Sequence, residues 1–119
     1  QIIGKAFGGT IVPNPLGWEM GRTTLKVEGR NERWAINSIH KEIVSVVPPG
    51  FKVFCSSDKC ANQGMINREA NIITWQGHPE VSNDQVFEIT QLRYKSGLIP
   101  IDIMQQVEST KNLPNDHDK

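Results

Sequence analysis

The stretch Ile73-Thr74-Trp75-Gln76-Gly77-His78-Pro79-Glu80 stands where the character of the chain changes. Short apolar runs precede it, and a helical spacing of apolar residues follows it. Because Pro79 has a fixed φ and disfavours the helical region for the residue before it, His78 is predicted to be extended. Side chains two positions apart in an extended segment point to the same side, so His78 and Glu80 are predicted to lie side by side.

Such a pair has a chemical use. A carboxylate that accepts a proton from one imidazole nitrogen holds the ring in one tautomer, and the other nitrogen can then act as a base. Gly77, which has no side chain, leaves room for a ligand or a neighbouring backbone. The alternative is an ordinary turn at the end of a strand, with His78 on the surface and Glu80 solvated. The catalytic interpretation also requires a nucleophile elsewhere.

The residues before this stretch favour strands. Gln1–Phe7 places apolar side chains on one helical face and ends at two glycines, which is typical of the end of a helix. Short β-branched runs bounded by turn residues then predict strands. These strands are Thr10–Val12, Gly17–Val27, Trp34–Ile39, Ile43–Val47 and Phe51–Cys55, followed by a hairpin of Gly64–Asn67 and Asn71–Trp75.

The residues after Glu80 favour helices. Ser82 and Gln85 have the spacing of a capping box, and the helix that they begin is expected to end near Gly97. Its expected apolar face consists of Val86, Phe87, Ile89 and Leu92. A second helix is predicted over Ile101–Thr110, and Asn112–Lys119, which includes His117, is predicted to be a frayed polar tail. The pattern predicts one α/β domain over residues 1–111, with a mixed sheet, a β-hairpin and flanking helices.

Composition narrows the classes of function. The 119 residues are 37% hydrophobic, and 13 basic residues balance 13 acidic ones. No electrostatic signature therefore argues for a nucleic-acid or membrane partner. Two cysteines are too few for a secreted disulfide scaffold, so a cytoplasmic location is expected. No ligand spacing indicates a metal site, and no cofactor is expected.

Cys55 and Cys60 are weak candidates for the nucleophile. A reactive thiol needs a helix N-terminus or a cationic neighbour to lower its pKa. Cys55 ends a predicted strand, and Cys60 has only Lys59 beside it in sequence. A disulfide between the two is disfavoured in the cytosol, and two cysteines do not complete a metal site. Both are expected to be free thiols in or near the core.

Several motifs, in order, resemble one enzyme family. Gln-Gly-His-Pro-Glu at residues 76–80 resembles the C-terminal signature of the class I (triad type) glutamine amidotransferases. Two further segments, Gln1–Gly9 and Ser38–Gly50, resemble this family in general, and Gly17–Gly21 resembles a segment of one of its branches. Ser56–Gly64 resembles the branch of stand-alone domains related to the glutaminase domain of GMP synthase. Several ordered motifs are more specific than one.

The resemblance implies a fold, an activity and a set of residues. The chain would be the C-terminal part of a flavodoxin-like domain. His78 and Glu80 would be the second and third members of a Cys-His-Glu triad, and the cysteine is expected upstream of this chain. Gln1 and the segment Ser38, Ile39 and His40 would bind substrate, although a simple loop histidine is an equal alternative for His40. No cofactor is implied.

Three functions stay open. The first is hydrolysis of glutamine by a domain that needs its N-terminal half and passes ammonia to a separate synthetase or acceptor protein. The second is cleavage of γ-glutamyl peptides by a peptidase of the same superfamily. The third is a catalytically inactive fragment that serves as a binding module. The 119 residues alone are expected to be inactive, and an unpaired sheet edge is expected to make them self-associate.

Overall fold

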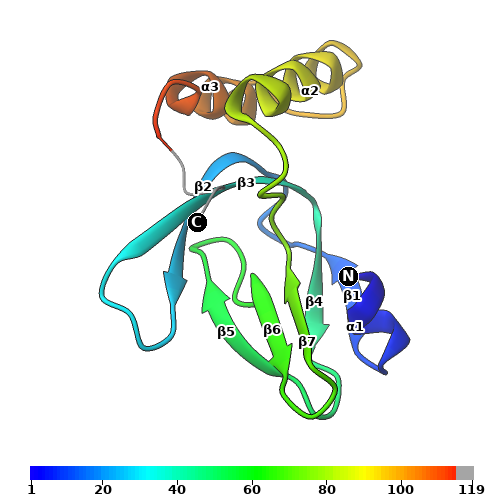
Figure 1. Cartoon of the computed structure of the whole chain (residues 1–119). Coiled ribbons are helices and arrows are strands. Elements are labelled where there is room, and N and C mark those ends of the chain that lie inside the picture. Colours follow the sequence, from blue (N-terminus) through cyan, green and yellow to red (C-terminus); the bar gives the residue numbers. More distant parts are fainter. Residues whose placement is uncertain (115–119) are drawn as a thin grey trace.

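The structure is a computed structural model that describes residues 1–114. Strands make up most of residues 10–75, and two helices follow them (Figure 1). The strands are β1 (Thr10–Pro13), β2 (Glu19–Val27), β3 (Arg33–His40), β4 (Glu42–Val46), β5 (Lys52–Ser56), β6 (Gly64–Asn67) and β7 (Ile72–Trp75). The helices are α1 (Ile2–Ala6), α2 (Asn83–Lys95) and α3 (Ile101–Thr110). The α/β class and the order of elements are confirmed.

The strands form two sheets. Five strands have the order β3-β2-β5-β6-β7, and β1 pairs with β4 in a separate two-stranded sheet. Every pairing in the described part of the chain is antiparallel, so the sheets differ in this detail from the mixed sheet that the sequence suggested. Antiparallel neighbours need only short connections, which agrees with the short turns between most of these strands.

The hairpin of β6 and β7 is present as predicted. Gly64 pairs with Trp75 and Asn67 pairs with Ile72, and residues 68–71 close the turn. Asn71 has a φ of 54°, a left-handed conformation that asparagine tolerates better than most residues. Trp75 packs on the strand face, against Trp34 and edge-on to Phe54.

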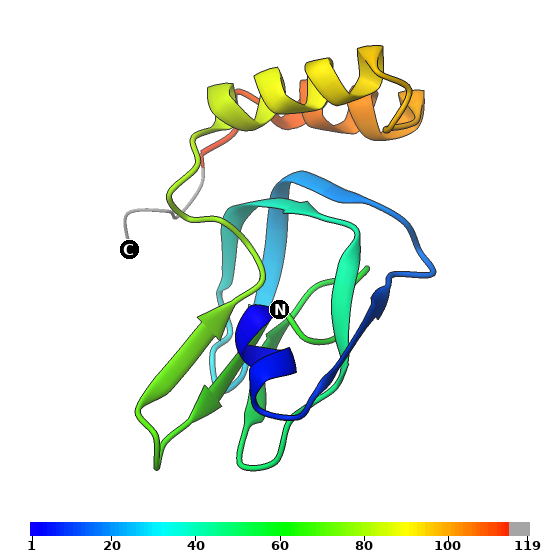
Figure 2. The same cartoon turned by 90° about the vertical axis from the view of Figure 1, so that its right-hand side faces the viewer.

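Helices α2 and α3 pack on each other and cover one end of β2 and β3 (Figures 1 and 2). The predicted capping box exists: the Ser82 hydroxyl oxygen accepts a hydrogen bond from the Gln85 amide, and the Gln85 side chain accepts one from Ser82 N–H. The apolar face differs at one position. Leu92 is 66% exposed, because α2 turns Thr90 inward in its place, while Val86 is buried as predicted.

The core has two parts. Between the sheet and α3, Met20 packs with Ile99, Ile103 and Val107. Between the strands, Leu25 and Val27 pack with Ile36 and Cys55. Cys55 and Cys60 are both buried and unpaired, so the prediction of free thiols in the core is confirmed.

Helix α1 is shorter than the sequence suggested and lies beside β1 (Figure 2). Only Gly4 is buried, where its missing side chain leaves room for Val44. Ile2 is 86% exposed, so the described residues leave its side chain uncovered, whereas Phe7 packs edge-on against Phe51. Of the predicted tail, residues 115–119 and with them His117 lie outside the described residues.

Candidate active site

His78 and Glu80 lie together after the last strand. The Nδ1 atom of His78 is 2.8 Å from Oε1 of Glu80, within hydrogen-bond distance. The two side chains are 43% and 62% exposed, so the pair is accessible to a small molecule. The predicted proximity is therefore present, and the imidazole has an acceptor that can fix its tautomer.

The backbone reason for this proximity differs from the predicted one. Val81 N–H donates to the His78 carbonyl oxygen at 3.1 Å, so residues 78–81 form a reverse turn and not an extended segment. Pro79 occupies the second position of this turn, where its fixed φ is favourable. The turn brings the carboxylate back to the imidazole.

Strand β3 holds this turn at both ends through Asn37. The His78 amide donates to the Asn37 carbonyl oxygen at 2.7 Å, and the Asn37 side-chain nitrogen donates to the Val81 carbonyl oxygen at 2.9 Å. The same nitrogen contacts the side-chain oxygen of Asn83 at 3.0 Å, and Asn37 is fully buried. Asn37 was not predicted from the sequence, because its contacts span more than 40 residues and no local pattern indicates them.

Gly77 allows β3 to come this close. A Cβ atom at Gly77 would lie 2.5 Å from Cδ1 of Ile36 and 3.2 Å from the Asn37 carbonyl oxygen. The expected close approach of a backbone is confirmed, and the neighbour is β3. A larger residue would push the turn away from the strand that fixes it.

One cavity lies against His78, and a second shares part of its wall. One, of about 400 Å³, is lined by His78 together with Gln1, Ile39 and Gln76. The other, of about 460 Å³, shares Gln1 and Ile39 with it and reaches His40. The structure thus brings the expected residues Gln1, Ile39 and His78 to one place.

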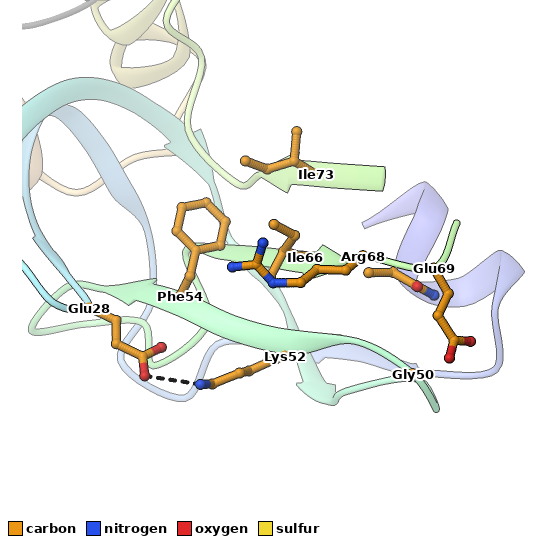
Figure 3. Close-up of a pocket in the computed structure, with 9 residues that line it drawn as sticks. Glu28, Gly50, Lys52, Phe54, Ile66, Arg68, Glu69 and Ile73 are labelled. Carbon is orange, nitrogen blue, oxygen red and sulfur yellow. Dashed lines mark ion pairs between the residues drawn. The ribbon is translucent and has the colours of Figure 1, made fainter. Parts of the chain in front are cut away.

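A further cavity, of about 600 Å³, lies elsewhere, on the face of β5, β6 and β7 (Figure 3). Phe54, Ile66 and Ile73 form its apolar part, and Lys52 pairs with Glu28 at 3.0 Å on its rim. None of the residues that line it is a histidine, cysteine or serine, so it offers neither an imidazole base nor a thiol or hydroxyl nucleophile. The cavities beside His78 are the better candidates for an active site.

Ser38 and His40 offer little side-chain surface to a ligand. Ser38 is fully buried, and His40, which borders the cavity of about 460 Å³, is only 4% exposed, so a ligand would meet mainly their backbone. The alternative of a loop histidine is wrong, because His40 is the last residue of β3 and lies directly opposite Glu19 in the sheet. Ile39 is the member of this segment that reaches both cavities.

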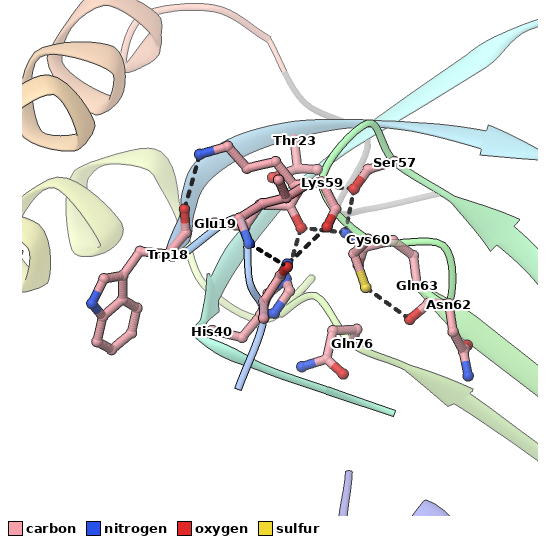
Figure 4. A network of polar contacts seen from close by, with 12 residues as sticks. Trp18, Glu19, Thr23, His40, Ser57, Lys59, Cys60, Asn62, Gln63 and Gln76 are labelled. Atoms are coloured by element: carbon pink, nitrogen blue, oxygen red, sulfur yellow. Dashed lines mark hydrogen bonds and ion pairs between the residues drawn. The ribbon is translucent and has the colours of Figure 1, made fainter. Parts of the chain in front are cut away.

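His40 belongs to a buried polar network (Figure 4). Its Nε2 atom lies 2.8 Å from Oε1 of Glu19, which also accepts a hydrogen bond from Gln63 at 2.6 Å. Ser57 donates to the other carboxylate oxygen at 2.6 Å. Burial alone would raise the pKa of Glu19, but the hydrogen bonds from His40, Ser57 and Gln63 and the charge of His40 hold it below its usual value.

Glu19 and Gln63 were not predicted as functional residues. Both stand in segments that carry the family resemblance, Gly17–Gly21 and Ser56–Gly64. Only the strand register could have indicated them, because the antiparallel pairing of β2 and β3 places Glu19 opposite His40. A register of this kind cannot be read from a single sequence when the connecting turn is not specified.

The two cysteines are unsuited to act as the nucleophile. Burial raises the pKa of Cys55 to about 12 and that of Cys60 to about 11. Both thiols are therefore protonated and shielded from solvent near neutral pH. Within residues 1–114, no group of three or more histidine, cysteine or acidic side chains could hold a metal ion.

The profile of the family described as glutamine amidotransferase class-I matches residues 1–88. The chain belongs to the class I glutamine amidotransferases. A relative from Saccharomyces cerevisiae, provisionally named a glutamine amidotransferase, is 34% identical over 90 residues, covering 71% of this chain and 36% of the yeast protein. The GMP synthase (glutamine-hydrolysing) of Bacillus cereus AH820 is 33% identical over 92 residues, covering 71% of this chain and 18% of the synthase.

A solved structure agrees with this assignment to the class I amidotransferases. A Thermoplasma acidophilum protein, provisionally named as part of a GMP synthase, superimposes with a TM-score of 0.61 at 27% identity, over 68% of this chain and 44% of the other. The chain spans less than half the length of the relatives that it matches.

Among the described residues, no helix of this amidotransferase chain is long and apolar enough to cross a bilayer.

Proposed function

We propose that this chain supplies the base and its orienting acid to a site that hydrolyses the side-chain amide of glutamine. The observation that carries the proposal is the 2.8 Å contact between His78 Nδ1 and Glu80 Oε1 at the mouth of a cavity that Gln1 also lines. The nucleophile is a thiol outside residues 1–119, since Cys55 and Cys60 are buried and protonated.

The chemistry follows from the tautomer. The Nδ1–H group of His78 donates a hydrogen bond to Glu80 and keeps its proton. The Nε2 atom of His78 is then free to take the proton of the attacking thiol. The thiolate sulfur bonds to the amide carbon, and His78 returns the proton to the departing nitrogen, which leaves as ammonia. Water then cleaves the thioester, giving glutamate and the free thiol. No metal or organic cofactor takes part in these steps.

Free glutamine is favoured over a γ-glutamyl peptide as the substrate. A cavity of about 400 Å³, with Gln1 and Ile39 in its wall, has room for glutamine and for a dipeptide alike, so its volume does not decide between them. Relatives named as glutamine-hydrolysing GMP synthases support the choice of glutamine and suggest that a synthetase, on the same or a separate chain, accepts the ammonia. The unpaired thiols suit a reducing compartment, and we place the protein in the cytoplasm.

Glutamate release by the intact parent protein tests the proposal, with free glutamine and γ-glutamyl dipeptides as parallel substrates. We expect glutamine to be preferred, and His78→Gln to lower kcat by about 10³-fold or more, because the base is lost. Glu80→Gln should lower kcat by about 10²-fold, because the amide no longer fixes the tautomer.

Asp84→Asn provides the matched control, since Asp84 is a nearby carboxylate in the first turn of α2 and, among the described residues, makes no hydrogen bond to His78. Its activity should stay within about twofold of the parent value. Preference for the dipeptides would support the γ-glutamyl peptidase instead. Release from neither substrate would support the inactive binding module.

A further inference from the structure

One backbone oxygen collects three side chains around the candidate site. The Glu42 carbonyl oxygen, at the start of β4, accepts a hydrogen bond from Nε2 of Gln1 at 2.9 Å and one from Nε2 of Gln76 at 3.4 Å. It also lies 3.2 Å from Nδ1 of His40. Gln1 lines both cavities, and Gln76 stands two residues before His78. The Glu42 carbonyl oxygen therefore binds two side chains of the candidate site.

His40 presents an oxygen to each of its ring nitrogens. Nδ1 faces the Glu42 carbonyl oxygen, and Nε2 faces the carboxylate of Glu19. Nδ1 and Nε2 lie on opposite sides of the ring, so the two contacts together fix the orientation of the imidazole between Glu19 and Glu42.

Glu19 is itself held firmly, at 7% exposure. Ser57 binds one carboxylate oxygen at 2.6 Å, and Gln63, which is fully buried, binds the other at 2.6 Å (Figure 4). Ser57 and Gln63 also contact each other at 2.8 Å. The carboxylate therefore cannot turn away from His40 without losing several strong hydrogen bonds.

We propose that Glu19 acts, through His40, as a positioning residue that fixes the Glu42 carbonyl oxygen. This oxygen in turn sets the side-chain amide of Gln1 at the wall where glutamine binds, and it anchors Gln76 before the catalytic turn. The inference rests on the proposed glutamine hydrolysis. Glu19 does not touch the substrate or the reacting atoms, so its loss weakens the binding of glutamine more than it slows the chemistry.

Glu19→Gln in the intact parent protein tests this, because it keeps the size of the side chain and removes its charge. We expect the KM for glutamine to rise about tenfold while kcat stays within about threefold of the parent value. Thr23→Val is the matched control. Thr23 is buried in β2, as Glu19 is, and its hydroxyl donates one hydrogen bond, to the Gly21 carbonyl oxygen, among the described residues. Its KM should not change. A folded Glu19→Gln variant whose KM stays within about twofold of the parent value overturns the inference.

If Glu19→Gln does not fold, two variants of His40 decide. An asparagine places its N–H near the position of Nδ1, toward Glu42, whereas a glutamine places it near Nε2, toward Glu19. Each variant therefore keeps one contact of His40 and loses the other, and we expect each to raise the KM about tenfold. A folded variant of either kind whose KM stays within about twofold of the parent value overturns the inference. A parent protein without glutaminase activity would instead remove the proposed function, and this inference with it.

Discussion

His78 and Glu80 could be found from the sequence because all that joins them is local. Pro79 restricts the backbone between them. The side chains of residues i and i+2 can meet both in a turn and in an extended segment. The type of backbone could not be found in this way, since the turn depends on hydrogen bonds from Asn37 in a distant strand. Glu19 and His40 likewise meet only through strand register.

The two thiols lead to a prediction at the same scale. Burial raises the pKa of Cys55 to about 12 and of Cys60 to about 11. In the intact parent protein, both should react with iodoacetamide at least about 10²-fold more slowly in the native than in the unfolded state. Lys59 separates the two in a tryptic digest, so mass spectrometry measures each one. Equal rates in the two states would contradict the buried placement.

The same pKa values give a dependence of stability on pH. Folded thiols keep their protons to a higher pH than unfolded ones, so the unfolded chain binds fewer protons above the ordinary value of 9.0. The free energy of unfolding should therefore fall as the pH rises from 9 toward 11, and urea titrations at several pH values measure it. Replacing both cysteines with serine should flatten this slope.

Among the elements, those with short-range signals were predicted well. The capping box of α2 and the hairpin of β6 and β7 each depend on residues within a few positions of one another. The face that a helix buries depends instead on what packs against it, and α2 turns Thr90 inward where the sequence favoured Leu92. Strand order is also non-local, because β2 pairs with both β3 and β5.

The contact between β3 and the segment after β7 gives a prediction at the element scale. In Gly77→Ala, the new methyl group would lie 2.5 Å from Cδ1 of Ile36 and 3.2 Å from the Asn37 carbonyl oxygen, so the buried Ile36 side chain or the segment itself must move. We expect the free energy of unfolding to fall by about 1–3 kcal/mol. Glutaminase activity should fall as well, because the turn that carries His78 shifts. Urea denaturation and steady-state kinetics measure the two effects.

A second-site change tests the stated cause. Ile36→Val removes the Cδ1 atom, and the double variant with Gly77→Ala should recover part of the lost stability and activity. The two substitutions should thus be non-additive, as residues in contact are. Strictly additive losses would show that the methyl group does not act through Ile36.

At the scale of the whole molecule, the order of the motifs in the sequence was enough to predict the family and the α/β class. Which apolar side chains are exposed could be learned only from the structure. Ile2 is 86% exposed and Ile73, on the edge strand β7, is 55% exposed. Both line the cavity beside His78. An edge strand with exposed apolar side chains is prone to pair with another chain.

The 119-residue chain by itself should therefore self-associate at micromolar concentrations, as analytical ultracentrifugation can measure. Ile73→Thr, which keeps a β-branched side chain and lowers its hydrophobicity, should reduce the association. A monodisperse monomer of the unaltered chain would contradict this prediction.

The most direct measurement of the central claim is covalent trapping of the intact parent protein with an electrophilic analogue of glutamine, followed by peptide mapping. The predicted result is a single alkylated cysteine outside residues 1–119, labelled at least about 10²-fold more slowly in His78→Gln. Labelling of Cys55 or Cys60, or a labelling rate that does not depend on His78, would contradict it.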